Sequence, residues 1–150
     1  MKKTLAALIL ASVAGSVLAQ QALKPEEMIK TRKAAYSFMA WNMGKIKANL
    51  DGSFNKDQVI ASANAVAAVA NSGLGALFGP GTDKEVGGEK TRVKPEFFQQ
   101  QDKVREVAMN FNKEANELAK VAATGDKAAI QAQFGKTGAT CKACHDSFRN

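Results

Sequence analysis

The two cysteines and the single histidine of this 150-residue chain lie within five consecutive positions, in the motif Cys-Lys-Ala-Cys-His at residues 141–145. Cysteines at i and i+3 lie about one helical turn apart and share a face. Both thiols can therefore reach the two vinyl groups of one haem, and the next residue, His145, is directed at the iron. Cys-x-x-Cys-His is the attachment pattern of c-type haem. The motif predicts one covalent haem c, with Cys141 and Cys144 as its thioether anchors and His145 as an axial iron ligand.

Three other uses of the same residues fit the sequence less well. A zinc site needs about four ligands, and the motif supplies only three. A thioredoxin-like cysteine pair follows a strand in an α/β fold, and no strand pattern is visible. A disulfide between Cys141 and Cys144 would close a very small loop, which adds little stability, and it would leave His145 unexplained.

Arg149 lies four residues after His145 and therefore on the same helical face. Two interpretations stay open for it. It covers the proximal side of the haem, or it is a surface arginine placed favourably at a helix C-terminus.

The first 19 residues have the pattern of a cleavable export signal. Lys2 and Lys3 precede an apolar run that ends in Val17-Leu18-Ala19, and the run is too short for a spanning helix. We expect cleavage after Ala19, a mature domain over 20–150, periplasmic localisation and no membrane span. The full chain carries a net charge of +7, but its lysines alternate with acids, so we expect no binding to nucleic acid.

Helical periodicity and end signals predict four helices, over about 25–50, 56–71, 95–124 and 127–148. Short links join the first to the second and the third to the fourth, which is typical of an all-α, antiparallel up-and-down four-helix bundle. The segment 71–94 holds six of the twelve glycines and is expected to be a long loop with a role in binding. In the third helix we expect the apolar stripe to comprise Phe97, Phe98, Val104, Val107, Met109, Phe111, Leu118 and Val121.

The second helix is built almost entirely from alanine and valine. Small side chains cannot fill a bundle interior by themselves, because protein cores are close-packed. Either the helices approach closely at a small-residue interface, or a bulky group occupies the interior.

The sixth position of the iron is left open by the residues alone. With the one histidine already used, the candidates are Met28, Met39, Met43, Met109 or no protein ligand. A methionine ligand, with Met39 as a candidate, would give a six-coordinate electron-transfer cytochrome. Methionines at helical spacing are more often part of the core.

Three stretches together resemble the bacterial cytochrome c′ family. They are CKACHDSFR at 141–149, FGPGT at 78–82, and KPEEMIKTRKAAYSFM at 24–39, which opens the first helix. The resemblance implies a haem buried in the core of a four-helix bundle, with a five-coordinate, high-spin iron whose only protein ligand is His145. It also implies that Tyr36 caps the distal face without binding the iron, so that NO and CO enter by displacing it.

The resemblance further implies a setting for the haem edge and for assembly. Arg32 is expected near the propionates, followed by Lys33 where many members carry glutamine. Thr91 and Arg92 of the long loop are further candidates to contact the haem edge. The family usually forms homodimers through its first two helices, where Trp41 serves either the interface or the core.

Two functions follow from these expectations: binding of NO or CO at an open iron, and one-electron transfer with periplasmic redox partners. An enzyme that cleaves peroxide would need a distal histidine or arginine for acid–base chemistry. The single histidine is assigned to the proximal side, so we do not expect an enzyme.

Overall fold

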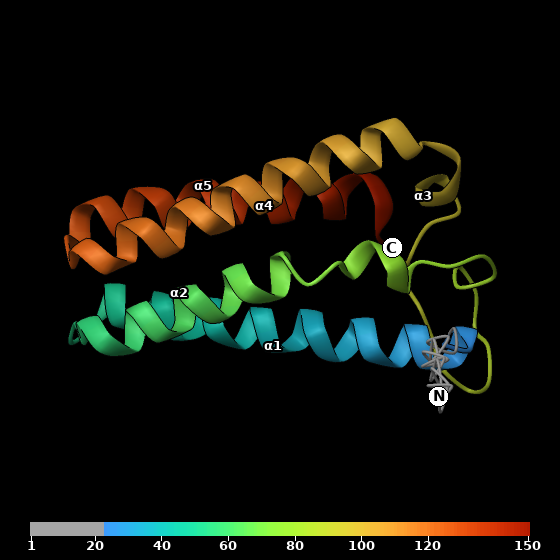
Figure 1. Ribbon diagram of the computed structural model, residues 1–150, viewed down its shortest axis with the longest axis horizontal. Coiled ribbons are helices and arrows are strands. Elements are labelled where there is room, and N and C mark those ends of the chain that lie inside the picture. Colours follow the sequence, from blue (N-terminus) through green and yellow to red (C-terminus); the bar gives the residue numbers. More distant parts are fainter. Residues whose placement is uncertain (1–22) are drawn as a thin grey trace, which may run out of the picture.

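The structure is a computed structural model that describes residues 23–150. Its four long helices are α1 (Pro25–Asp51), α2 (Lys56–Ala70), α4 (Gln101–Thr124) and α5 (Lys127–Phe148). The connection between α2 and α4 contains a short 3-10 helix, η1 (Leu74–Leu77), and a single turn, α3 (Glu96–Gln99). The predicted all-α four-helix bundle is confirmed (Figure 1). The predicted export signal, 1–19, lies outside the described residues.

The helix ends follow local sequence signals. Asn55 caps α2 by accepting a hydrogen bond from the Gln58 backbone N–H at 3.0 Å. Asp126 caps α5 in the same way, because its carboxylate accepts from the two backbone N–H groups of residues 128 and 129. Gly125, with φ at +77°, ends α4 in the left-handed conformation that glycine adopts readily.

Two details of the predicted third helix are wrong. It does not run unbroken from residue 95, because Gln100 (φ −112°, ψ 55°) leaves the helical region and separates α3 from α4. Met109 is not part of the apolar stripe, since its side chain is 65% exposed. The buried positions of α4 are Ala115, Leu118 and Ala122, and position 109 lies off that stripe by the helical spacing.

The closed apolar core fills one half of the bundle, at the end where α1 turns into α2 and α4 into α5. Its members are buried aliphatic and alanine side chains, namely Ile46, Leu50, Val59, Ala63, Leu118, Ala122 and Ile130. A smaller cluster, Val66, Ala70 and Ala115, continues it towards the middle. The alanines of α2 therefore do serve close helix packing in this half.

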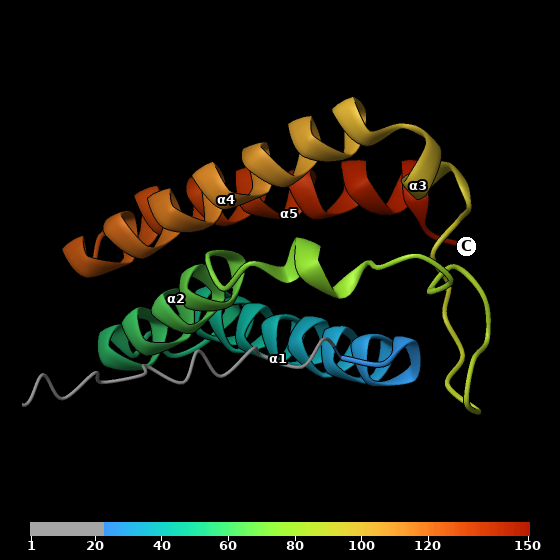
Figure 2. The same cartoon turned by 45° about the vertical axis from the view of Figure 1, so that its right-hand side comes forward.

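The other half of the bundle is arranged more openly. The pair α4 and α5 lies over the pair α1 and α2 in both views, and the connection 71–100 crosses the end near the C-terminus (Figures 1 and 2). Helix α1 packs on α2, α2 on α4, and α4 on α5, whereas α1 and α5 meet only over a short stretch. The motif at 141–145 lies in this half. None of the helices in the described part has the length and apolar character needed to cross a membrane.

Candidate functional site

The motif Cys-Lys-Ala-Cys-His forms part of the last turns of α5, as its spacing predicted. Cys141 and Cys144 are half-buried and not joined in a disulfide. Burial raises the pKa of both thiols, and the neighbouring Cys141 raises that of Cys144 further. The two thiols are therefore protonated at neutral pH. His145 is exposed, so its imidazole is accessible from outside the bundle.

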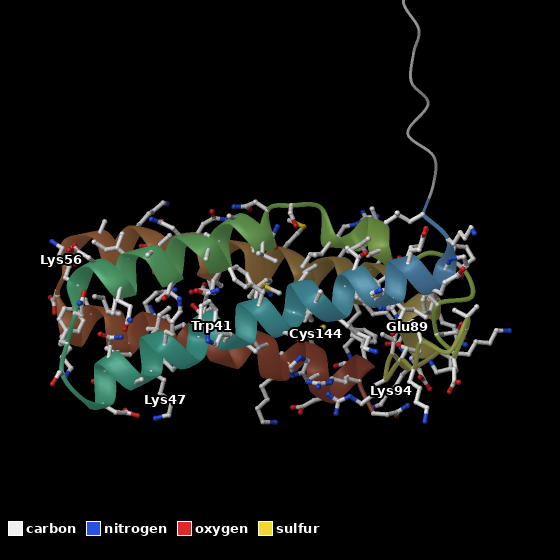
Figure 3. The ribbon with its side chains drawn as sticks, turned by 90° about the horizontal axis from the view of Figure 1, so that it is seen from below. Trp41, Lys47, Lys56, Glu89, Lys94 and Cys144 are labelled. Atoms are coloured by element: carbon white, nitrogen blue, oxygen red, sulfur yellow. The ribbon has the colours of Figure 1, made fainter. Side chains whose placement is uncertain are left out.

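Tyr36 of α1 lies across the open side of the bundle from this motif. Burial raises the pKa of Tyr36 to about 12; at high pH the thiolate forms of Cys144 and Cys141 add to the shift, and the Arg32 cation opposes it. The phenol thus lies within electrostatic reach of both thiols. Its side chain is still 41% exposed, and Figure 3, viewed from the α1 side, shows Cys144 beyond that helix. The structure brings Tyr36 near the two cysteines. The sequence analysis assigns the cysteines to the attachment of one haem and Tyr36 to the distal face of that haem.

Arg32, one turn before Tyr36 on α1, is 3% exposed and holds the long connection in place. Its Nη1 donates to the Leu77 carbonyl at 3.1 Å and to Thr82 Oγ1 at 2.8 Å. Its Nη2 donates to the Thr82 carbonyl and, at 2.7 Å, to Thr91 Oγ1. The guanidinium also lies 4.6 Å from the ring centroid of Phe78. One side chain therefore ties both arms of the connection to α1.

All acceptors around Arg32 are uncharged. Within residues 23–150 no carboxylate lies within ion-pairing distance of its guanidinium, and burial lowers the pKa of Arg32. Arginine carries five N–H donors. The connection takes four of them, which leaves Nε–H without a partner in the described chain. Buried charges are normally paired, so this position suits an anionic group that the protein itself does not supply.

The remaining predicted site residues have the following surroundings. Lys33 Nζ forms an ion pair with the Glu89 carboxylate at 2.9 Å. Arg92 is exposed, and its carbonyl accepts from the Asn150 backbone N–H at 2.9 Å. Arg149 Nη1 lies 3.4 Å from Nδ1 and 3.5 Å from Nε2 of His145, so it is placed beside the imidazole. The predicted contacts of these side chains with a haem stay predictions.

Of the four methionines considered as the sixth iron ligand, the best placed lies in the interior of α1. Met39 is buried one turn after Tyr36, and Met43 packs against the apolar core. Met28 lies near Gly79 of the connection. Met109 is too exposed to reach the interior. Met39 is therefore the candidate of the methionine-ligated alternative.

Sequence reasoning missed an aromatic cluster that joins four parts of the molecule. Phe78 of the connection stacks on Phe97 of α3 at 4.4 Å between centroids, and Phe97 meets Phe148 of α5 edge-on at 5.6 Å. Tyr36 meets Phe78 edge-on at 6.4 Å. Phe78 opens the FGPGT stretch, but its partners are too distant in sequence for any local pattern to predict them.

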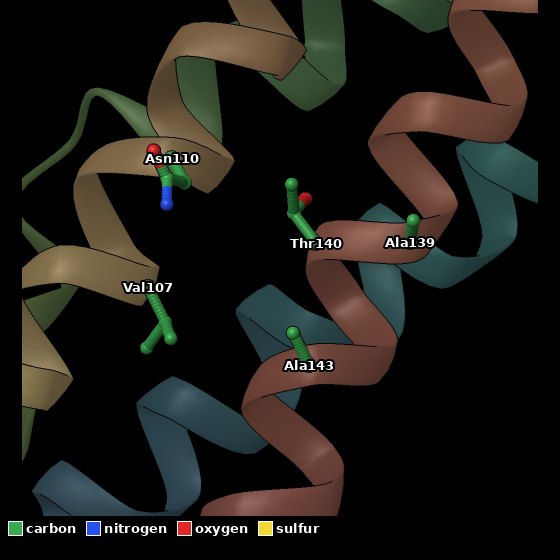
Figure 4. A pocket seen from close by; sticks show the side chains of 5 residues that line it. All are labelled: Val107, Asn110, Ala139, Thr140 and Ala143. Atoms are coloured by element: carbon green, nitrogen blue, oxygen red, sulfur yellow. The ribbon is translucent and has the colours of Figure 1, made fainter.

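A hollow of about 200 Å³ lies between α4 and α5 beside the motif (Figure 4). It is lined by Val107, Asn110, Ala139, Thr140 and Ala143. The Thr140 hydroxyl already donates to the Thr137 carbonyl at 2.7 Å. The polar side chains of the lining are the Asn110 amide and the Thr140 hydroxyl. Among residues 23–150 no group of three or more histidine, cysteine or acidic side chains is gathered to hold a bare metal ion.

Comparison with known proteins gives a consistent match along the chain. The family model described as Cytochrome C′ matches residues 27–149. The cytochrome c′ of Allochromatium vinosum is 57% identical over 146 residues, covering 97% of this chain and 94% of that protein. A solved cytochrome c′ described as having an unusual ligand-controlled dimer dissociation is 61% identical, with a TM-score of 0.84 over 85% of this chain and 97% of that one.

A more distant solved structure adds a bound ligand. It is a nitric oxide complex of a mutant cytochrome c prime from Alcaligenes xylosoxidans. It is 29% identical to this chain, with a TM-score of 0.74, and the match covers 85% of this chain and 96% of that one.

Proposed function

This chain belongs to the cytochrome c′ family of haem c proteins, and on that premise we propose that it carries a five-coordinate iron that binds NO or CO and takes part in one-electron transfer. The proposal places the protein in the periplasm, after removal of residues 1–19. It is a binding and electron-transfer protein and not an enzyme, because the single histidine is used on the proximal side and leaves no distal histidine for acid–base chemistry.

The described residues fit a covalent haem. Cys141 and Cys144 share one face of α5, which suits the two thioether bonds, and His145 follows as the axial ligand. Arg32 is a buried cation with one free N–H and no carboxylate partner, which suits a propionate. When bound, the haem supplies an iron that takes up a diatomic gas or exchanges one electron.

Tyr36 is the observation that carries the five-coordinate assignment. It lies opposite the motif, and its pKa is raised to about 12. A tyrosine binds haem iron through its oxygen, as in catalase, and the anionic form is the stronger ligand. Burial is the main cause of this shift and does not depend on free thiols, so we place Tyr36 on the distal side as a neutral ring. A small gas that displaces the ring finds the position vacant.

The spectra of the ferric and ferrous protein test this proposal. We expect a high-spin ferric EPR signal and a ferrous protein that binds CO and NO. Tyr36→Leu should raise the association rate for CO, because the smaller side chain obstructs the distal side less. A low-spin ferric spectrum that becomes high-spin in Met39→Leu would instead establish the methionine-ligated alternative and refute the five-coordinate one.

We also propose that the chain forms a homodimer through α1. Phe38 and Trp41 of this helix are 47% and 60% exposed, and Lys45 Nζ lies 3.8 Å from the Trp41 ring centroid. The alternative that Trp41 belongs to the core is wrong at that exposure. Tyr36 lies on the same helix, two residues before Phe38. The two side chains point to different sides of α1, so a ligand that displaces Tyr36 acts on the dimer face through the helix itself. On the likeness to the 61% identical relative, we extend ligand-controlled dissociation to this chain.

Sedimentation velocity tests the dimer. The ferrous protein should sediment as a dimer and shift towards the monomer when CO is added. Trp41→Glu should give a monomer under both conditions. If the unaltered protein is a monomer without ligand, the dimer proposal is contradicted. If it is a dimer that does not dissociate when CO is added, only the proposed control of dissociation by ligand is contradicted.

A further inference from the structure

The end of α5 is joined to the long connection by a short antiparallel pairing. Val93 and Arg149 form an isolated bridge. The Lys94 backbone N–H donates to the Phe148 carbonyl, and the Asn150 N–H donates to the Arg92 carbonyl, both at 2.9 Å. This pairing holds the cations of residues 92–94 beside those at the end of α5.

Four cations gather around this end of the helix, and we call them the cationic face: Arg92, Lys94, Lys103 and Arg149. Lys94 Nζ donates to the Asp146 carbonyl at 3.3 Å. Lys103 of α4 lies over the Phe148 ring, with Nζ 5.8 Å from the centroid. Arg149 lies beside the exposed imidazole of His145. The face therefore lies at the end of α5 that carries the residue assigned as the iron ligand.

These charges are not neutralised by the protein. In the described part of the chain, the lysines with a carboxylate within 4.0 Å are Lys33, Lys47, Lys113, Lys120 and Lys142. No member of the cationic face is among them. The nearest acid in sequence to His145 is Asp146, which pairs with Lys142 at 2.5 Å. Glu96 and Asp102, close in sequence to Lys94 and Lys103, are exposed and belong to none of the ion pairs within residues 23–150, so they reduce the local excess of positive charge without removing it.

We propose that the cationic face is the docking surface for an acidic one-electron carrier protein. The inference rests on the proposed haem function and adds the class of redox partner and the place where it binds. A concentration of one sign of charge steers an oppositely charged partner and orients it in the encounter complex. Here that orientation sets the partner against the exposed side of His145. One electron passes from the reduced protein to the oxidised carrier, which is thereby reduced by one electron; no bond is formed or broken and no proton moves.

The test uses the holoprotein with plastocyanin, an acidic copper protein, as the probe. Stopped-flow absorbance gives the second-order rate constant for oxidation of the reduced protein by oxidised plastocyanin. It is measured from low salt to about 0.5 M ionic strength, where the Debye length shrinks to a few ångströms. The altered protein is the double variant Lys94→Glu with Lys103→Glu. The matched control is Lys127→Glu with Lys136→Glu, which changes the net charge equally at exposed positions earlier in α5.

We expect a rate constant that falls with salt in the unaltered protein. At low salt the Lys94/Lys103 variant should be about tenfold slower, a size within the known range of electrostatic steering, whereas the control should change less than about twofold. The variants should converge at high salt. Equal rates for variant and control, or a wild-type rate indifferent to salt, would overturn the proposal. So would loss of binding to phosphatidylserine vesicles in the variant with unchanged electron transfer, which would assign the face to a membrane.

A binding measurement separates this proposal from the haem assignment. Redox-inert, cadmium-substituted plastocyanin is titrated into the 15N-labelled protein, and amide shifts are followed by NMR. We expect the shifts to concentrate at residues 92–94 and 142–149 and to vanish in the Lys94/Lys103 variant. Shifts elsewhere refute the docking surface even if haem is present. Conversely, a negative pyridine haemochrome assay refutes the haem assignment whatever the titration shows.

Discussion

Replacing Arg32 with methionine removes the guanidinium that ties the connection to α1, while it keeps a side chain of similar length in the buried position. In the unaltered protein this group donates four hydrogen bonds, two of them to the backbone carbonyls of Leu77 and Thr82. The hydroxyls of Thr82 and Thr91 can turn to other partners, and Thr82 Oγ1 already lies 2.8 Å from the Gly79 carbonyl. The two carbonyls cannot turn, so they carry the main cost.

A buried acceptor left without a donor costs about 1–3 kcal/mol. Two such carbonyls therefore cost about 2–6 kcal/mol, and removal of a buried cation offsets part of this because its desolvation is no longer required. We expect Arg32→Met to lower the free energy of unfolding by about 3 kcal/mol. The loss should be concentrated in the connection, since all four acceptors belong to it.

Urea unfolding of the holoprotein and amide hydrogen exchange measure the two parts of this expectation. Lys33→Met is the matched control, because it removes one positive charge from the next residue of the same helix. Lys33 pairs with Glu89 at 2.9 Å with 53% of its own side chain exposed, and exposed pairs contribute at most about 1 kcal/mol. Faster exchange should appear across residues 77–91 in the Arg32 variant and not in the control. If the two variants lose equal stability and exchange alike, Arg32 does not hold the connection, and the reasoning fails.

Three further predictions concern the core, a helix end and the distal side. Leu118→Ala should lower the free energy of unfolding by about 3 kcal/mol through a cavity in the closed core, which a fall in the urea midpoint at unchanged slope would show. Asp126→Ala should cost about 1 kcal/mol, because the N–H groups of Ala128 and Ala129 lose their acceptor; a loss below about 0.3 kcal/mol would contradict the capping role. Tyr36 is the single tyrosine, so 13C NMR of its ring follows one ionisation. We expect none until the pH approaches 12. Because its folded pKa is raised from the ordinary value of 10.0, the neutral phenol's contribution to stability is complete below pH 10 and is lost as the pH rises from 10 towards 12. A midpoint near 10 would contradict the burial of the phenol.

Most of the bundle could be predicted because the signals that specify its helix ends lie close to those ends in sequence. Asn55, Gly125 and Asp126 each act within four residues of their own position, so a single sequence contains the whole signal. The motif at 141–145 could be predicted equally well, because its spacing and the helix that carries it are both specified by neighbouring residues. The break at Gln100 has no such signal, because glutamine is a good helix former and its type predicts that the helix continues.

The Arg32 contacts could not be predicted in the same way, because they join positions 45 to 59 residues apart. One local sign did exist. Residues Ile29, Arg32, Met39, Asn42 and Ile46 are all buried on α1, so a charged residue at position 32 interrupts an otherwise regular interior stripe. A charge on such a stripe indicates a buried partner without saying which one. Similarly, the apolar type of Met109 predicts a core position, whereas its helical spacing from Ala115 and Leu118 places it off the buried face.

The pairing of residues 92–94 with 148–150 has a consequence for the order of events during synthesis. A chain grows from its N-terminus, so the segment that closes this end of the bundle emerges long after the connection that it must hold. Contacts between segments distant in sequence form late, because closing a long loop costs entropy before any contact repays it. Cys141 and Cys144 lie on the segment that this late pairing fixes in place. Until then their thiols remain outside a finished fold, within reach of any machinery that must act on them.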